Sequence, residues 1–324
     1  GADDDLATAR LDAPPAARFR GQGVMPMTID PIHPPILEVT GLTMRFGGIL
    51  ALNDISFAVK CNSISALIGP NGAGKTTVFN CLTGFYKATE GRIALHTPRA
   101  AIDLISILGQ PFKASDFINP AVFADRLYYK MFGGTHRVTR AGVARTFQNV
   151  RLFKEMTAIE NLLVAQHLQL NRNLLAGLLR TAAYRQSERD ALERAYAWLQ
   201  VFGLAEDANR LAGELPYGHQ RRLEIARAMC TSPRLLCLDE PAAGLNPRET
   251  TELSQLIRQL RDEHGVTILL IEHDMSLVMD LSEHIVVLDY GEVIADGDPQ
   301  TVAHHPAVLA AYLGTEAVND DESR

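Results

Sequence analysis

The stretch GPNGAGKTT, residues 69–77, decides the fold of this 324-residue chain. It fits the pattern G-x-x-x-x-G-K-[ST], and it lies between an apolar run, residues 64–69, and a helical pattern that stops at Gly84. Glycines in such a loop let backbone N–H groups turn inward around phosphate oxygens, and the helix that follows presents its positive end to the same anion. The strand, loop and helix together predict a phosphate cradle rather than a merely structural glycine-rich turn.

Individual residues of this loop receive predicted roles. The Lys75 ammonium reaches the outer phosphates of a nucleotide, and the Thr76 hydroxyl coordinates Mg²⁺. The loop residues that we expect to bind the nucleotide are Gly69, Asn71, Gly72, Ala73, Gly74, Lys75, Thr76 and Thr77. The loop therefore predicts a nucleoside triphosphate and Mg²⁺ as the bound groups.

Two acidic residues end a second apolar run, RLLCLDE, residues 234–240. An acidic side chain at the exposed end of a buried strand is suited to hold Mg²⁺, directly or through water, and Asp239 is predicted to do so. Glu240 is then placed to orient or deprotonate the attacking water. The alternative is that both acids only begin the next turn.

Gln148, in ARTFQNV, and His273, in LLIEHD, follow a loop and an apolar run. Gln148 is predicted to contact Mg²⁺ or the attacking water, and His273 to contact the γ-phosphate. Each residue taken alone is also explained as an ordinary hydrogen-bonded side chain, so the prediction depends on their combination with the cradle. The predicted catalytic residues are thus Glu240, His273 and Gln148, and the predicted Mg²⁺ ligands are Thr76, Gln148 and Asp239.

Apolar runs without alternation, at residues 64–69, 234–240 and 266–273, are typical of strands covered on both faces of a parallel sheet. Residues 284–297 predict a strand, a turn near Tyr290–Gly291 and another strand. With the helical patterns between them, these runs indicate a layered α/β core.

The middle of the chain is different, because residues 157–202 carry a helical pattern and no convincing strand. Thr157 and Glu160 form a T-x-x-E capping box. A second helix is expected to begin near Ser187, and Gly203 is placed to end it. A helical subdomain therefore interrupts the α/β core.

Three segments carry no predicted chemistry. Residues 1–35, rich in Ala, Asp and Pro, are expected to be a flexible leader, and residues 317–324 an acidic, frayed tail. Residues 99–136 read as a surface insertion with a short helix between Pro120 and Gly133.

Composition limits the classes of function. A net charge of −7 without a long basic block argues against broad attraction to nucleic acid or to an anionic membrane surface. The four scattered cysteines lack ligand spacing and predict reduced thiols in a cytosolic protein. No apolar run reaches the length of a membrane span, and we expect no signal peptide.

Over nearly the whole of residues 36–316, the chain resembles the ATP-binding-cassette (ABC) ATPases. The resemblance lies in the order of its motifs, which is the cradle, Gln148, PYGHQRR, DE, GLN and His273. The resemblance implies a P-loop NTPase (RecA-like) α/β core with an antiparallel β subdomain and an inserted α-helical signature subdomain at about residues 150–228. It also implies head-to-tail pairing of two such subunits around two ATP molecules. The family's signature, L-S-G-G-Q, then faces the partner's nucleotide, and it aligns here with Pro216, Tyr217, Gly218, His219 and Gln220.

The alignment explains why a glycine, Gly218, lies at the start of a predicted helix. Gly218 is expected to face nothing in its own chain, because its target is a phosphate held by the partner. The resemblance also departs from the family pattern, with Tyr217 in place of Ser, His219 in place of the second Gly, and Asn246 where Asp is usual. Tyr217, Gly218, His219 and Gln220 remain predicted nucleotide contacts. Phe46 is predicted to stack on adenine, with a buried core Phe as the alternative.

A narrower resemblance, to the ATPase subunits of branched-chain amino acid importers, is visible in YGHQRRLEIARAM, LDEPAAGLNP and HHPAVLAAYLG. It implies an ATP-hydrolysing motor at the cytoplasmic face of the inner (plasma) membrane. Its partners would be a second ABC ATPase subunit, identical or different, two transmembrane permease subunits and an extracytoplasmic solute-binding protein, with no nucleic acid. Related ATPases for urea, amides or lipopolysaccharide export stay open as alternatives, as do non-transport members and a nucleotide-binding pseudo-ATPase.

Overall fold

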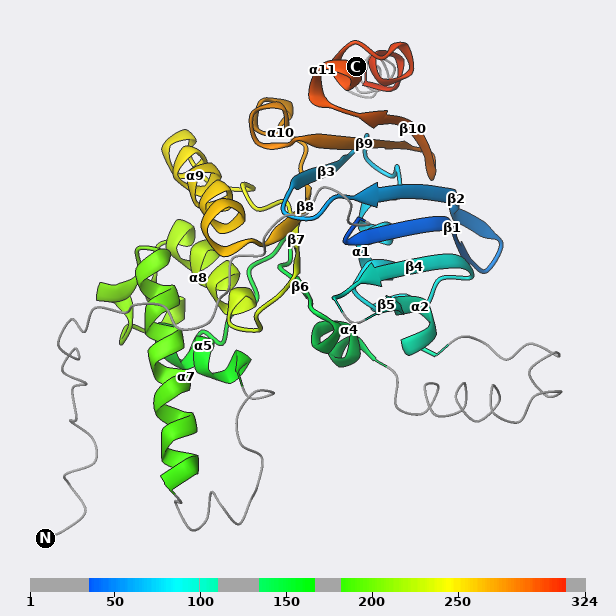
Figure 1. The fold of residues 1–324 in the computed structure, drawn as a ribbon. Helices are drawn as coiled ribbons and strands as arrows, with labels where there is room; N and C mark the ends of the chain where they lie inside the picture. The colour runs from blue at the N-terminus through cyan, green and yellow to red at the C-terminus, as the bar shows by residue number, and fades with distance from the viewer. Residues whose placement is uncertain (1–34, 99, 110–133, 167–181, 313–324) are drawn as a thin grey trace, which may run out of the picture.

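The computed structural model describes residues 35–98, 100–109, 134–166 and 182–312, and a six-stranded sheet lies at its centre (Figure 1). The strand order is β10-β9-β3-β8-β7-β6, and all neighbours are parallel except β10 and β9. Every residue of β3, β7 and β8 is buried, so the prediction of strands covered on both faces is confirmed. The strand bounds are β3 Ile64–Ile68, β6 Val143–Arg145, β7 Leu235–Asp239, β8 Thr267–Ile271, β9 His284–Asp289 and β10 Glu292–Gly297.

The carboxyl ends of the parallel strands carry the polar residues singled out in the sequence. The cradle follows β3, Asp239 ends β7, and His273 comes shortly after β8. Gln148 follows β6 in the same way. Because parallel strands end at one edge of a sheet, segments far apart in the chain converge there.

A second sheet is antiparallel, with the order β2-β1-β4-β5. Helix α1, Lys75–Leu82, buries Phe79 and Leu82 in a hydrophobic cluster that includes Leu37 of β1 and Leu67 of β3. The predicted antiparallel β subdomain is therefore confirmed, and it shares a core with the cradle helix. The strand bounds are β1 Leu37–Phe46, β2 Ile49–Val59, β4 Glu90–His96 and β5 Ala101–Asp103.

Helices gather beside the β6 end of the six-stranded sheet (Figure 1). Leu199 of α7 and Leu223 of α8 belong to the same hydrophobic cluster as Leu236 of β7, so this group packs directly onto the sheet. The elements are α5 Ala158–Ala165, α7 Ala182–Val201, α8 Tyr217–Met229 and the short 3₁₀ turns η2 Ala205–Asp207 and η3 Ala212–Glu214.

Two of the predicted helix boundaries here are confirmed and one is wrong. The Thr157–Glu160 capping box is present at the start of α5, and Gly203 lies just beyond the end of α7. Helix α7, however, begins at Ala182 rather than near Ser187. The residues before Ser187, AAYRQ, include good helix formers, so the helix extends past a residue that would otherwise be a fitting N-cap.

Five further described helices lie outside this group. They are α2 Leu104–Ile107, α4 Thr135–Ala141, α9 Pro247–His264, α10 Met275–Leu281 and α11 Pro299–Ala303. At the start of the segment 99–136, β5 pairs with β4, with Ile102 opposite Leu95. The predicted helix between Pro120 and Gly133, nearly all of the leader, and the acidic tail lie outside the described residues.

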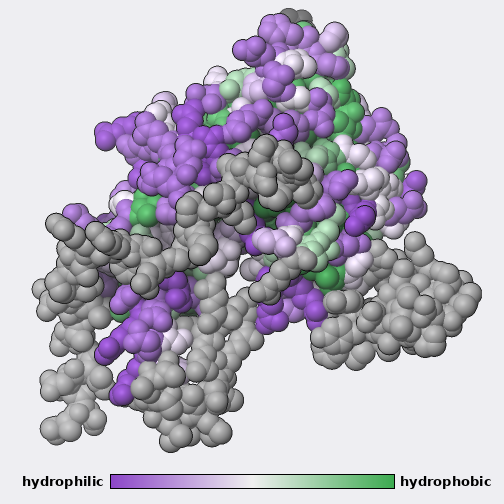
Figure 2. Space-filling view, viewed as in Figure 1, coloured by the Kyte–Doolittle hydropathy of each residue, from purple (hydrophilic) through white to green (hydrophobic). Residues whose placement is uncertain are grey.

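The surface of the described part is mainly hydrophilic in the view of Figure 2, with smaller hydrophobic patches between. Among the described residues, no helix combines the length and apolar character that crossing a membrane requires.

The cysteines offer a chemical test of this core. Burial raises the pKa of Cys81, Cys230 and Cys237 to about 12. It also raises the pKa of Cys61, an effect that the charge of Arg234 opposes, but Cys61 is the one exposed thiol of the four. Since the thiolate is the nucleophile, we expect iodoacetamide at pH 8 to label Cys61 alone in the native protein and all four thiols in denaturant. Intact-mass spectrometry measures this, and a second rapid native adduct would contradict the burial of the other three.

Candidate functional site

The cradle loop is built so that two of its positions accept only glycine. Gly69 and Gly74 have φ of +147° and +102°, in the region that other residues rarely adopt. A Cβ on Gly69 would overlap the Leu288 carbonyl oxygen, and a Cβ on Gly74 would lie 2.7 Å from Leu52 Cδ2. The loop is therefore pressed between β9 and β2, and its shape depends on both sheets.

Lys75 lies folded over this loop. Its Nζ donates to the carbonyl oxygens of Gly69 at 2.6 Å and Pro70 at 2.9 Å. Burial lowers the pKa of Lys75, while the charges of Glu240 and Asp239 raise it. These couplings mean that the ammonium and the two acids share one electrostatic environment, as a site for a phosphate chain and a cation requires.

Asp239 forms a buried ion pair that the sequence did not predict. Its Oδ2 accepts a hydrogen bond of 2.6 Å from Arg145 Nη2, and the two side chains are only 7% and 6% exposed. Arg145 also donates to Asn80 Oδ1 and Thr83 Oγ1 on and beside α1, and its guanidinium lies 5.2 Å from the centre of the Phe147 ring. Arg145 thus joins β6, β7 and the cradle helix. The only signal in the sequence was a charged residue in a strand that leads to Gln148.

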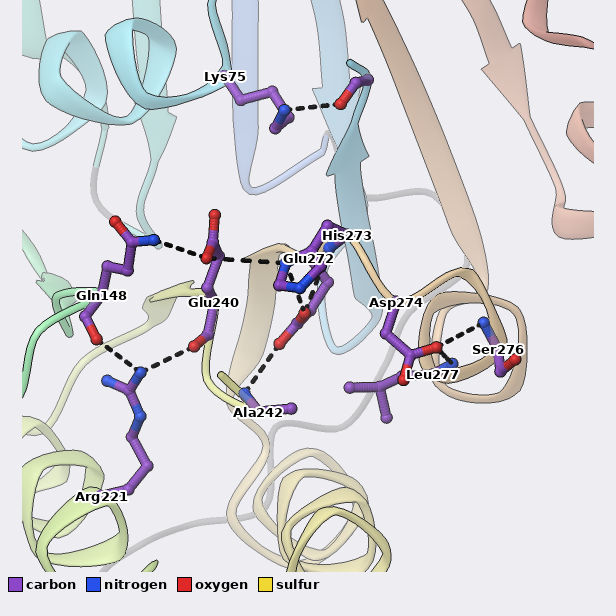
Figure 3. Close-up of polar contacts among 11 residues, drawn as sticks. Lys75, Gln148, Arg221, Glu240, Ala242, Glu272, His273, Asp274, Ser276 and Leu277 are labelled. Carbon is purple, nitrogen blue, oxygen red and sulfur yellow. Dashed lines mark hydrogen bonds and ion pairs between the residues drawn. The ribbon is translucent and has the colours of Figure 1, made fainter. Parts of the chain in front are cut away.

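Two of the three residues predicted to be catalytic, Gln148 and His273, approach one carboxylate oxygen of the third, Glu240 (Figure 3). Gln148 Nε2 donates to Glu240 Oε2 at 2.8 Å, and His273 Nδ1 lies 3.7 Å from the same oxygen. Glu240 itself has φ of +45°, a sparsely populated backbone conformation for a residue with a side chain. Strained residues of this kind cluster at functional sites. The roles of the three side chains toward water and phosphate remain predictions.

Glu272 is a further buried acid that the sequence analysis missed. It accepts the Ala242 N–H on Oε1 at 2.8 Å and the His273 N–H on Oε2 at 3.2 Å (Figure 3). Burial raises the pKa of Glu272, and these two backbone amides act in the opposite direction. The side chain fixes the turn after Glu240 and the position of His273. A Glu directly before His273 was its only sequence signal.

The expectation that Gly218 faces nothing in its own chain is wrong. Gly218 is buried in the first turn of α8, and a Cβ there would lie 2.6 Å from Glu249 Oε1. Glu249 belongs to a capping box with Asn246 at the start of α9. The first turn of α9 therefore reaches α8 at Gly218, and any side chain at this position would force the Glu249 carboxylate to move.

The other signature residues also have partners in their own chain. His219 Nδ1 lies 2.8 Å from Asp207 Oδ2, and Gln220 Nε2 donates to the Leu215 carbonyl oxygen at 2.8 Å. Partial burial acts to raise the pKa of Asp207, but hydrogen bonds from Arg210 and His219 lower it overall. Tyr217 is exposed, and its ring lies against the backbone of Gly244. Contact of these residues with a partner's nucleotide stays a prediction.

Phe46, at the end of β1, is 40% exposed and forms a T-shaped ring pair with Tyr86, with 5.1 Å between the ring centroids. The alternative of a buried core Phe is therefore wrong. An exposed aromatic ring suits stacking on a nucleobase, which remains the prediction for this residue.

The donor set at this edge of the sheet suits Mg²⁺. Hydroxyl, carboxylate and amide oxygens are hard ligands, and Thr76, Asp239 and Gln148 supply one of each type. Asp239 uses Oδ2 for Arg145, so its other carboxylate oxygen would be the one to face a cation.

Comparisons with known proteins agree with this arrangement. Residues 52–243 match the family described as ABC transporter, and residues 292–318 match the family described as branched-chain amino acid ATP-binding cassette transporter. The chain is 56% identical over 280 residues to the high-affinity branched-chain amino acid transport ATP-binding protein BraF of Pseudomonas aeruginosa, covering 86% of this chain and 98% of BraF. It is 52% identical over 280 residues to LivG of Escherichia coli K12, with the same coverage of both chains.

Solved structures give the same result for the fold. The chain is similar to the ADP conformation of MJ1267, an ATP-binding cassette of an ABC transporter, with a TM-score of 0.66 and 29% identity. The similarity covers 87% of this chain and 100% of that one. A nucleotide-free ATP-binding cassette of an ABC transporter gives a TM-score of 0.65 and 29% identity, with coverage of 86% and 98%.

Proposed function

The chain belongs to the ABC transporter ATP-binding family, and from that membership we propose that it is the ATP-hydrolysing motor of an importer for branched-chain or other hydrophobic amino acids. The family supplies the use of ATP. The observation that carries the hydrolytic role is the Glu240 carboxylate, which Gln148 and His273 approach at the edge of the phosphate cradle. The amino acid specificity is supported by the likeness to BraF and LivG, whose names describe branched-chain amino acid transport.

In the proposed reaction, the backbone amides of residues 69–77 and the Lys75 ammonium hold the phosphates of ATP. Glu240 Oε2 accepts a proton from the attacking water. The Gln148 amide, whose Nε2 lies 2.8 Å from that carboxylate oxygen, orients the water. His273 lies at the same oxygen and contacts the γ-phosphate. Thr76, Asp239 and Gln148 would hold Mg²⁺, which would supply positive charge beside the phosphate oxygens.

The composite site is also part of the proposal. The start of α8, with Gly218, faces the ATP of a second ABC ATPase subunit, and its backbone amides add positive potential at the γ-phosphate. Two permease subunits and an extracytoplasmic binding protein complete the importer. The chain then lies at the cytoplasmic face of the membrane, held by docking to the permeases, as its hydrophilic surface and the absence of a spanning helix among the described residues allow.

The decisive experiment identifies the solute. The chain is purified with the membrane subunits that accompany it, placed in vesicles, and supplied with its binding protein. Leucine, isoleucine or valine is expected to raise ATP hydrolysis about tenfold over vesicles without the binding protein, because closure of the ATPase pair is coupled to the loaded transporter.

Urea and simple amides, tested at the same concentrations, serve as controls and are expected to leave the rate unchanged. If only urea or amides stimulated hydrolysis, the proposed solute would be wrong, but the proposed role as a transport ATPase would stand. A rate of hydrolysis per molecule that does not change on dilution of a monomeric protein would instead overturn the composite site.

A further inference from the structure

Arg221 of α8 carries a completely buried side chain with 0% exposure. A buried guanidinium is costly unless it is paired and hydrogen-bonded, so its partners are informative. Nη1 donates to the Phe147 carbonyl oxygen at 2.6 Å, and Nη2 donates at 2.8 Å to the carbonyl oxygens of both Gln148 and Glu240. Figure 3 shows Arg221 between these last two residues. One side chain thus holds the backbone of two residues of the proposed hydrolytic site.

Glu224, on the same face of α8, strengthens this attachment. Its Oε2 accepts a hydrogen bond from Arg221 Nη1 at 3.1 Å, and its Oε1 accepts the Arg151 N–H at 3.1 Å. Burial raises the pKa of Glu224, and the Arg151 amide and the Arg221 charge oppose that shift. Together the two side chains form a bracket, here called the Arg221–Glu224 bracket, that fastens residues 147–151 to α8.

The backbone of Glu240 needs such support. Its φ of +45° is a conformation that persists only where surrounding bonds determine it. The Glu240 N–H donates to the Ile271 carbonyl oxygen at 2.9 Å, and its carbonyl oxygen accepts the bond from Arg221. Arg221 therefore fixes one side of the peptide that aims the Glu240 carboxylate.

We propose that Arg221 is a positioning residue, which holds the backbone of Glu240 and of Gln148 in place relative to each other and to α8. This inference rests on the proposed function, because the geometry that Arg221 maintains is that of ATP hydrolysis. The planar guanidinium reaches three carbonyl oxygens from one place, whereas a lysine ammonium is a point charge without that fork. Because the start of α8 faces the partner's nucleotide in the proposed dimer, Arg221 also connects this chain's own site with the neighbouring one.

Arg221→Lys is the variant that tests the inference, since it keeps the charge beside Glu224 and loses the fork. We expect kcat to fall about 100-fold, because small misplacements of catalytic groups have effects of this size. The Kd for MgATP is expected to change by less than about twofold, because Arg221 makes no bond to the cradle in the described residues.

Arg222→Lys is the matched control. Arg222 follows Arg221 directly, and its guanidinium pairs with Glu252 on α9 instead of with the residues around Gln148 and Glu240. Its kcat is expected to stay within about twofold of the wild type. A second test variant, Glu224→Gln, keeps the size of the side chain but removes its charge and one of its two acceptor oxygens, so it loses one of the bonds to Arg221 and Arg151. Its kcat is expected to fall about tenfold with unchanged affinity for MgATP.

A double-mutant cycle with Gln148→Ala separates positioning from a general effect on folding. If Arg221 acts by aiming Gln148, the combined loss in kcat is smaller than the product of the single losses, by about fivefold or more. Three results would overturn the inference. They are single losses in kcat that multiply in the double variant, a loss of affinity for ATP that parallels the loss in kcat, and a kcat of Arg221→Lys equal to that of the wild type. A wild-type protein without dimer-dependent hydrolysis would instead overturn the proposed function, so the two failures are distinguishable.

Discussion

Glu240→Gln is expected to lower ATP turnover by about 100-fold or more and to accumulate an ATP-bound dimer. The glutamine keeps the size of the side chain, and its amide can still bond to Gln148, which lies 2.8 Å from Glu240 Oε2. It cannot accept a proton from water, so the step after dimer closure is blocked while ATP binding is preserved. Steady-state phosphate release and light scattering with MgATP measure the two effects.

Glu263→Gln is the control for this substitution. Glu263 is an exposed residue of α9 that bonds to Gln259, and its replacement is expected to leave both turnover and the ratio of monomer to dimer unchanged. If Glu240→Gln stopped hydrolysis without trapping a dimer, Glu240 would be needed for ATP-driven closure rather than for activating water.

Gly218→Asp is expected to lower hydrolysis by about 100-fold or more, as the loss of a group that stabilises developing charge does. The aspartate places negative charge and bulk where the start of α8 faces the partner's γ-phosphate in the proposed dimer. The affinity of the monomer for ATP is expected to be unchanged, because the cradle of the same chain lies on another element. Calorimetry on dilute protein and hydrolysis assays at high protein concentration separate these quantities.

The structure adds a necessary control to this experiment. A Cβ at Gly218 lies 2.6 Å from Glu249 Oε1, so the new carboxylate also meets a negative charge in its own chain. Gly218→Asp is therefore repeated in a Glu249→Ala background, which removes that contact. Persistent loss of hydrolysis supports the role in trans, whereas recovery in the double variant assigns the loss to a clash between α8 and α9.

The cradle was predictable because its information is local. A strand, a glycine loop and a helix lie in one continuous stretch, and GPNGAGKTT identifies them without any other part of the chain. The convergence of Asp239, Glu240, Gln148 and His273 was nearly as accessible, since buried parallel strands must end at one edge. The apolar runs that define β7 and β8 were enough to place three of these four residues.

Other features of the site could not be read in this way. Arg145 and Asp239 are 94 residues apart, and Arg221 lies 73 residues from Gln148, so no sequence spacing marks either contact. The buried arginines look like ordinary charged residues of a strand and of a helix. Gly218 was recognised as unusual, but the nearest reason for it is the Glu249 side chain of its own chain, which only the packing of α9 on α8 reveals.

The sequence by itself determined the family, the α/β core and the loop that is predicted to hold phosphate, because each is written in short contiguous patterns with a fixed physical meaning. Only the tertiary structure decided how those residues are held. The bonds that hold them join separate elements of the chain. They are the bonds from Arg145 to Asp239, from Arg221 to the Glu240 carbonyl oxygen and from the Ala242 amide to Glu272. Buried polar groups must find partners wherever the packing of the elements brings them, and that packing is a property of the whole core.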